Sequence, residues 1–195
     1  ESCFQKILTE KANGTSGYDN LPYEDNRAIF DYIHTNQAFL QSIKTLVIVG
    51  IGGSSLGTKA IDALLSHQNN RKNIKIRFLE HTDPIMIHND LQRVKCEESL
   101  FIVISKSGLT IETTSLFKYI LQRFCLLETK NKKRLITITD EDSPLFQWSK
   151  SENIQSFTIK PNIGGRFSVL SAVGLLPLAI LGYDICNILK GAQNI

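Results

Sequence analysis

Three hydroxyl side chains and a glycine gather in one short loop, which follows an apolar run and precedes a helix-like pattern. The loop consists of Ser105, Lys106, Ser107, Gly108, Leu109 and Thr110. The first N–H groups of a helix lack partners within the helix, and the helix dipole adds partial positive charge there, so such a loop suits a phosphate dianion. Thr110 could instead serve only as a helix cap, with Glu112 and Thr113 as ordinary first-turn residues. Because a cap needs one hydroxyl, the three hydroxyls and the glycine favour phosphate binding.

Four glycines and a serine form a second loop, directly after the apolar run Leu46–Val49. They are Gly50, Gly52, Gly53, Ser54 and Gly57. Glycine lets the backbone approach a ligand closely, since no Cβ stands in the way. The spacing departs by one residue from two nucleotide-binding motifs. Ser55 stands where a dinucleotide fingerprint has its third glycine, and Lys59 falls one residue later than the lysine of a P-loop.

Three interpretations of this glycine loop remain open. A sugar or sugar phosphate could be held by the glycine backbone and the Ser54 hydroxyl. A dinucleotide could be bound if Glu80, near the end of the second apolar run, accepts hydrogen bonds from a ribose. The glycines could also serve only the close packing of a helix on a sheet.

A third loop places Gly164 and Gly165 directly before Arg166, which immediately precedes the apolar stretch Phe167–Tyr183. The planar guanidinium group suits oxyanions. A simple surface arginine is the alternative, but the N-terminal end of a helix disfavours a cation. We therefore expect Arg166 to be partly desolvated and to have an anionic partner. The apolar stretch itself is expected to be a buried helix that packs on two sides, one of them against sequence outside this chain.

Alternating strand-like and helix-like patterns predict how these loops are positioned. The expected strands are Leu46–Val49, Ile74–Leu79, Leu100–Ile104, Leu135–Thr139 and Ser156–Ile159. The expected helices are Glu24–Ile43, Ser55–His67, Pro84–Val94, Thr110–Leu127 and Ser143–Ser149. This order predicts an α/β fold with a doubly wound, mostly parallel five-stranded sheet flanked by helices on both faces. Ligands bind beyond the carboxyl ends of such strands, where the three loops lie. Residues 1–23 are expected to be a leader or arm with little structure of its own.

Composition narrows the classes of partner. The net charge of +3, with both signs interspersed, forms no basic stripe, so we expect no nucleic-acid partner. The stretch Phe167–Tyr183 falls short of the roughly 20 apolar residues of a membrane span, so no membrane is expected. No secretory signal is visible. The scattered cysteines indicate neither a zinc site nor a disulfide framework, which fits a cytoplasmic location. They are Cys3, Cys96, Cys125 and Cys186.

The motifs GIGGSSLG, SKSGLTIET and GGRFSVLSAVGL together resemble the sugar isomerase (SIS) domain of the phosphoglucose isomerase family, in order and in spacing, over roughly residues 20–192. The resemblance implies that Gly53 and Ser54 contact sugar hydroxyls. It also implies that Arg166, next to Gly165, stabilises a negatively charged enediolate. The residues that it assigns to phosphate binding are Ser105, Ser107 and Thr110, with Lys106, largely through its backbone, and Gly108 completing the loop.

The activity implied by the resemblance is interconversion of glucose 6-phosphate and fructose 6-phosphate through an enediolate. No metal or organic cofactor is implied, because proton transfer through an enediol needs neither. Residues 24–195 would be the first sugar isomerase domain, with the second domain, the glutamate base, a histidine and a lysine beyond residue 195, and the full-length enzyme would be a homodimer. A standalone sugar-phosphate sensor and an isomerase that also accepts mannose phosphate are the alternatives.

Overall fold

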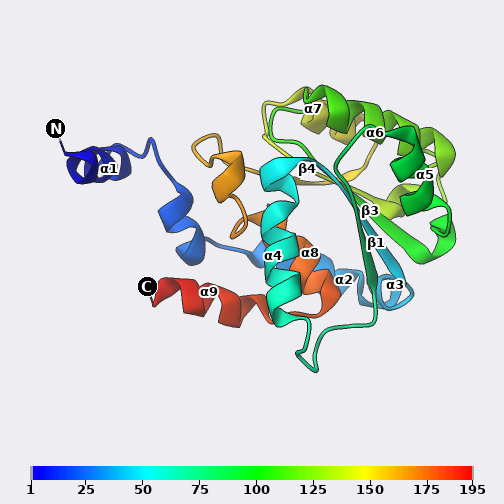
Figure 1. The fold of residues 1–195 in the computed structure, drawn as a ribbon, viewed down its shortest axis with the longest axis horizontal. Coiled ribbons are helices and arrows are strands. Elements are labelled where there is room, and N and C mark those ends of the chain that lie inside the picture. Colours follow the sequence, from blue (N-terminus) through cyan, green and yellow to red (C-terminus); the bar gives the residue numbers. More distant parts are fainter. Residues whose placement is uncertain (1, 195) are drawn as a thin grey trace.

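The computed structural model describes residues 2–194 and contains a five-stranded sheet (Figure 1). The strand order is β2-β1-β3-β4-β5, and every neighbouring pair is parallel. The strands are β1 (Thr45–Val49), β2 (Lys75–Leu79), β3 (Ser99–Ile104), β4 (Leu135–Thr139) and β5 (Gln155–Thr158). The predicted α/β class and five-stranded sheet are confirmed, with strand ends shifted by one residue or less.

Helices cover both faces of the sheet, which lies between them in Figure 1. On one face lie α2 (Arg27–Thr35), α3 (Gln37–Gln41), α4 (Leu56–Leu65), α8 (Ala172–Leu181) and α9 (Ile185–Gln193). On the other lie α5 (Pro84–Leu91), α6 (Ile111–Arg123) and α7 (Pro144–Ser151). Because successive strand residues point to opposite faces, Leu46 and Ile48 join the first core, whereas Val47 and Val49 join the second. Burial on both faces explains why β1 and β3 are nearly continuous apolar runs, whereas the outer strands β2 and β5 alternate with polar residues.

Two helical segments differ from the expected pattern. The single helix expected over Glu24–Ile43 is interrupted at Asn36, between α2 and α3. The Asn36 side chain donates to the carbonyl of Tyr32 at 2.9 Å. Asparagine side chains that bond nearby backbone in this way compete with a continuing helix. The second difference is that the helical sequence after the apolar stretch forms a separate helix, α9; Asp184 caps its start by accepting from the Asn187 amide.

The N-terminal segment has more structure than expected, so the prediction of a largely unstructured arm is wrong. Helix α1 (Cys3–Ala12) is capped by Ser2, and a 3₁₀ turn follows at Tyr18–Tyr23. Helix α1 has no buried residue and projects away from the sheet in Figure 1. The 3₁₀ turn, by contrast, buries Leu21 and contacts α9.

Helix α8 is buried within this chain. Eight of its residues, including Pro177, are buried, and it contacts α2, α4 and α9. The expectation that sequence outside this chain would cover one side of it is therefore wrong. The helix ends at Gly182, whose φ of 97° lies in the left-handed region that favours glycine. Within residues 2–194, no helix is both long and apolar enough to span a bilayer.

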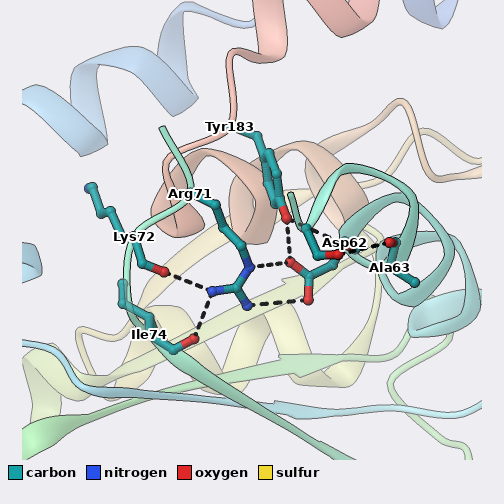
Figure 2. Close-up of polar contacts among 7 residues, drawn as sticks. Asp62, Ala63, Arg71, Lys72, Ile74 and Tyr183 are labelled. Carbon is teal, nitrogen blue, oxygen red and sulfur yellow. Dashed lines mark hydrogen bonds and ion pairs between the residues drawn. The ribbon is translucent and has the colours of Figure 1, made fainter. Parts of the chain in front are cut away.

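A polar cluster ties α4 to the start of β2 and to the α8–α9 connection (Figure 2). Arg71 donates to both carboxylate oxygens of Asp62, at 2.9 and 3.3 Å, and Tyr183 Oη donates to Oδ1 at 2.6 Å. Arg71 also donates to the carbonyls of Lys72 and Ile74. Burial alone would raise the pKa of Asp62, but the two donors outweigh it and the pKa is lowered. Burial, and then the bond to Asp62, raises the pKa of Tyr183 to about 12.

Candidate functional site

The three predicted loops meet at the carboxyl edge of the sheet, where the strand order reverses. Strands β1 and β3 are neighbours, but α4 follows β1 on one face and α6 follows β3 on the other. The two loops therefore diverge and leave a crevice. A cavity of about 600 Å³ lies there. Its lining includes Ile51, Ser54, Ser105, Lys106, Ser107, Leu109, Thr110, Thr113, Asp140, Asp142, Ser143, Pro144 and Pro161.

The loop over residues 105–110 presents hydrogen-bond donors that the protein itself does not use. The Ser105 hydroxyl is buried and has no partner among the described residues. The backbone amides of Lys106 and Ser107 likewise donate to no acceptor within residues 2–194. Thr110 is the N-cap residue of α6, yet its hydroxyl makes no capping bond. An unpaired buried hydroxyl is costly, so this arrangement matches a ligand rich in oxygen acceptors better than a simple cap.

Gly108 and Ser107 give this loop its turn. Gly108 has a φ of 67°, and a Cβ there would lie 2.9 Å from Leu145 atoms. Only glycine adopts this conformation without strain or overlap. The Ser107 hydroxyl accepts a bond from the Leu109 amide at 3.2 Å. Gly108 therefore shapes the loop and does not line the cavity.

The Lys106 side chain connects two of the loops. Its Nζ donates to the carbonyls of Pro161 and Ile163, at 2.5 and 2.8 Å. The ammonium group is thus engaged with backbone just ahead of Gly164, and the Lys106 amide is what this residue adds to the unpaired donors of the loop over residues 105–110. No residue pattern pointed to this clamp, because a carbonyl acceptor can belong to any residue type.

The glycines of the first loop allow backbone to pack against backbone. A Cβ on Gly53 would lie 2.1 Å from the Gly165 carbonyl oxygen and 2.7 Å from the Arg166 nitrogen. A Cβ on Gly50 would lie 2.7 Å from the Ile104 carbonyl oxygen. The packing interpretation therefore accounts for these two glycines, while Ile51 and Ser54 are the residues of this loop that line the cavity.

The residues behind the two nucleotide alternatives are engaged with one another. Glu80 accepts hydrogen bonds from the Ser55 hydroxyl and the Lys59 ammonium group. Burial alone would raise the pKa of Glu80, but these donors outweigh it and the pKa is lowered. Neither Glu80 nor Lys59 lines the cavity. This arrangement disfavours both a ribose-binding and a P-loop role.

Arg166 differs from the expectation. It is exposed rather than partly desolvated, and it lies in a 3₁₀ turn, Gly165–Phe167, ahead of α8 and its cap Ser171. The argument from the helix dipole therefore does not apply. Among residues 2–194 it forms no ion pair. Neither Arg166 nor Gly165 lines the cavity, although Gly165 contacts the first loop through Gly53.

Two contributors to the site were not predicted. The loop after β4 adds Asp140, Asp142 and Ser143 to the cavity wall. The rule that ligand-binding loops follow parallel strands would have pointed to it. The N-terminal segment supports the third loop, because Tyr18 stacks on Phe167 with ring centroids 5.0 Å apart. Within the described residues, no group of three or more potential metal ligands is present.

Comparison with known proteins places this chain in a family. A glucose-6-phosphate isomerase of Campylobacter jejuni is 40% identical over 192 residues, which are 96% of this chain and 46% of that protein. A hypothetical protein from Thermus thermophilus, solved by crystallography, superposes with a TM-score of 0.87 at 31% identity, covering 97% of this chain and 45% of its own. A glucose-6-phosphate isomerase from Chlamydia trachomatis shares the fold, with a TM-score of 0.73 at 24% identity, over 90% of this chain and 36% of its own.

The chain spans a little under half the length of the first two relatives. The sequence profile described as "Phosphoglucose isomerase" matches residues 32–195. This match covers most of the chain, including the first strand, all three loops and the buried helix that follows them. The chain belongs to the phosphoglucose isomerase family.

Proposed function

We propose that this chain supplies the phosphate-binding and sugar-binding loops of an enzyme that interconverts glucose 6-phosphate and fructose 6-phosphate. The observation that carries the proposal is the buried, unpaired Ser105 hydroxyl at the cavity, next to the unpaired amides of Lys106 and Ser107. A phosphate dianion supplies several strong acceptors, and it suits the N-terminus of α6 electrostatically. Ser107 and Thr110 add hydroxyls from the same loop.

The rest of the substrate extends from the phosphate toward the glycine loop. Ser54 lies on the cavity wall and offers a hydroxyl to the sugar, and Gly53 holds that loop against Gly165. Asp140 and Asp142 line the same cavity and offer acceptors for sugar hydroxyls. The phosphate thus anchors the substrate at one end, and polar contacts orient the sugar at the other.

Arg166 takes the electrostatic role in the proposed reaction. Isomerisation moves a proton between C2 and C1 and places negative charge on an enediolate oxygen. Because Arg166 has no ion-pair partner among the described residues, its guanidinium group is available for this charge. A cation near the developing charge stabilises the transition state more than the substrate, because the substrate does not carry that charge. The base and the ring-opening groups are proposed to come from the remaining half of the longer relatives, and a homodimer is the proposed assembly.

Calorimetric titration of this chain tests the proposal. We expect glucose 6-phosphate and inorganic phosphate to bind, and glucose to bind far more weakly. In Ser105→Ala the affinity for both phosphates should fall about 10-fold or more, the value of a hydrogen bond to a charged group. Ser66→Ala, an exposed serine at the end of α4, is the matched control and should bind as wild type. Equal affinity for glucose and glucose 6-phosphate would disprove the proposal.

A further inference from the structure

Thr139, the last residue of β4, lies beneath the phosphate loop and is completely buried. Its Oγ1 donates to the Ser105 carbonyl at 2.6 Å and also lies 3.2 Å from the Lys106 carbonyl. The Asp140 amide donates to the same Lys106 carbonyl at 3.0 Å. Two successive carbonyls of the phosphate loop are therefore held from the end of the neighbouring strand.

The direction of the hydrogen bonds behind Thr139 follows from counting protons. A carbonyl only accepts, so the single hydroxyl proton of Thr139 points toward the loop. Ser143 Oγ lies 2.6 Å from Thr139 Oγ1 and must therefore be the donor in that contact. Ser143 in turn accepts from the Phe146 amide at 3.1 Å, as the N-cap of α7. The relay thus runs from the Phe146 amide through Ser143 and Thr139 to the Ser105 carbonyl.

We propose that Thr139 and Ser143 are positioning residues for phosphate binding, acting through this relay. This proposal rests on the proposed function of the loop over residues 105–110. The Ser105 carbonyl and the Lys106 amide belong to one peptide unit, so fixing the carbonyl fixes the direction of the unpaired amide. Hydrogen bonds in such a chain polarise one another, which also strengthens that amide as a donor. The relay therefore presets the loop before the ligand arrives.

Thr137 offers a matched comparison on the same strand. It is also completely buried, and it lies on the same face as Thr139, since side chains alternate along a strand. Its hydroxyl bonds Ser149 at 2.7 Å and Ser156 at 2.9 Å, which lie in α7 and β5. Replacement of either threonine by valine removes one buried hydroxyl and keeps nearly the same side-chain size. Of the two, it is the Thr139 hydroxyl that bonds the phosphate loop.

The experiment compares Thr139→Val, Thr139→Ser and Thr137→Val in the chain of residues 1–195. Titration with inorganic phosphate gives Kd, and thermal unfolding gives Tm. Residue-resolved hydrogen exchange without ligand follows the amides of Gly108 and Asp140, which donate to the Ser105 and Lys106 carbonyls. In Thr139→Val we expect Kd to rise and both amides to exchange faster, each roughly 3- to 10-fold, the factor that one neutral hydrogen bond supplies. Thr139→Ser keeps the hydroxyl and should restore the wild-type Kd and the wild-type exchange rates of both amides.

Thr137→Val should lower Tm about as much as Thr139→Val while leaving the phosphate Kd and the two amides unchanged. The proposal is overturned if Thr139→Val changes the two amides no more than Thr137→Val does, or if Thr139→Ser fails to restore them. Because hydrogen exchange is measured without ligand, it tests the relay independently of phosphate binding. A wild-type chain that binds no inorganic phosphate would refute the proposed function and leave the relay to be decided by exchange.

Discussion

Gly53→Ala should separate two loops that the structure holds in backbone contact. The added Cβ would lie 2.1 Å from the Gly165 carbonyl oxygen, 0.9 Å short of the 3.0 Å below which such contacts essentially never occur. The obstructing atoms are backbone, so neither can rotate away. One loop must therefore move by close to 1 Å. Gly53 has no positive φ, so the cost is overlap alone and should be about 1–3 kcal/mol.

The assay for Gly53→Ala combines thermal unfolding with two titrations. A chain of this size should lose about 2–4 °C in Tm for each kcal/mol. The affinity for glucose 6-phosphate should fall, because Ser54 moves with its loop, whereas inorganic phosphate, held by the loop after β3, should bind within about twofold of wild type. Gly191→Ala in α9 is the control: its Cβ meets nothing within 4 Å, and alanine there should stabilise the helix by roughly 0.5–1 kcal/mol. Unchanged Tm and unchanged glucose 6-phosphate affinity in Gly53→Ala would refute this reasoning.

Two further substitutions test contacts outside the ligand cavity. Asp62→Asn should lower the free energy of unfolding by about 1–3 kcal/mol at pH 7. Because the pKa of Asp62 is lowered in the folded state, the stability that its carboxylate contributes is present above the unfolded pKa of about 3.9 and is lost as pH falls through the folded value. Denaturant unfolding should therefore show the gap to wild type closing below about pH 4, and a pH-independent gap would contradict the role given to the Arg71 pair. Lys106→Met keeps the aliphatic stem but removes both bonds to the 161–163 segment, so chymotryptic cleavage after the exposed Phe167 should accelerate roughly 3- to 10-fold. Cleavage at the wild-type rate would mean that the clamp does not hold the third loop.

The sheet could be predicted because burial on both faces leaves a simple signal. Runs such as Leu46–Val49 and Leu100–Ile104 are apolar at every position, and the helical patterns between them imply parallel crossovers. Elements with weaker periodicity in their sequence were harder to predict. The break at Asn36 depends on one side-chain bond to Tyr32, and α1 buries nothing, so no apolar stripe marks it.

The site was predictable where side-chain type carries the chemistry and unpredictable where backbone does. The hydroxyls of Ser105 and Thr110 could be read directly, and the structure places both at the cavity. The contacts of Gly53 with Gly165, and of Lys106 with two carbonyls, involve backbone atoms far away in the chain, which no residue pattern encodes. The exposure of Arg166 was missed because the turn that carries it precedes α8 instead of belonging to it.

Because the order of strands in the sheet differs from their order in the chain, some contacts must wait during synthesis for residues made much later. Thr45 of β1, the strand between β2 and β3, pairs with Lys75 and with Ser99, so β1 is synthesised before either neighbour. The loop over residues 105–110 lacks its bond from Thr139 until that residue is made, and Lys106 can bond the Ile163 carbonyl only 57 residues later. At a translation rate of about 5–20 residues/s, that last interval lasts roughly 3 to 11 s. For much of this interval the apolar strand β3 has an unpaired backbone edge, because its partner β4 is not yet made. A chaperone that shields strand edges would therefore matter most at this stage.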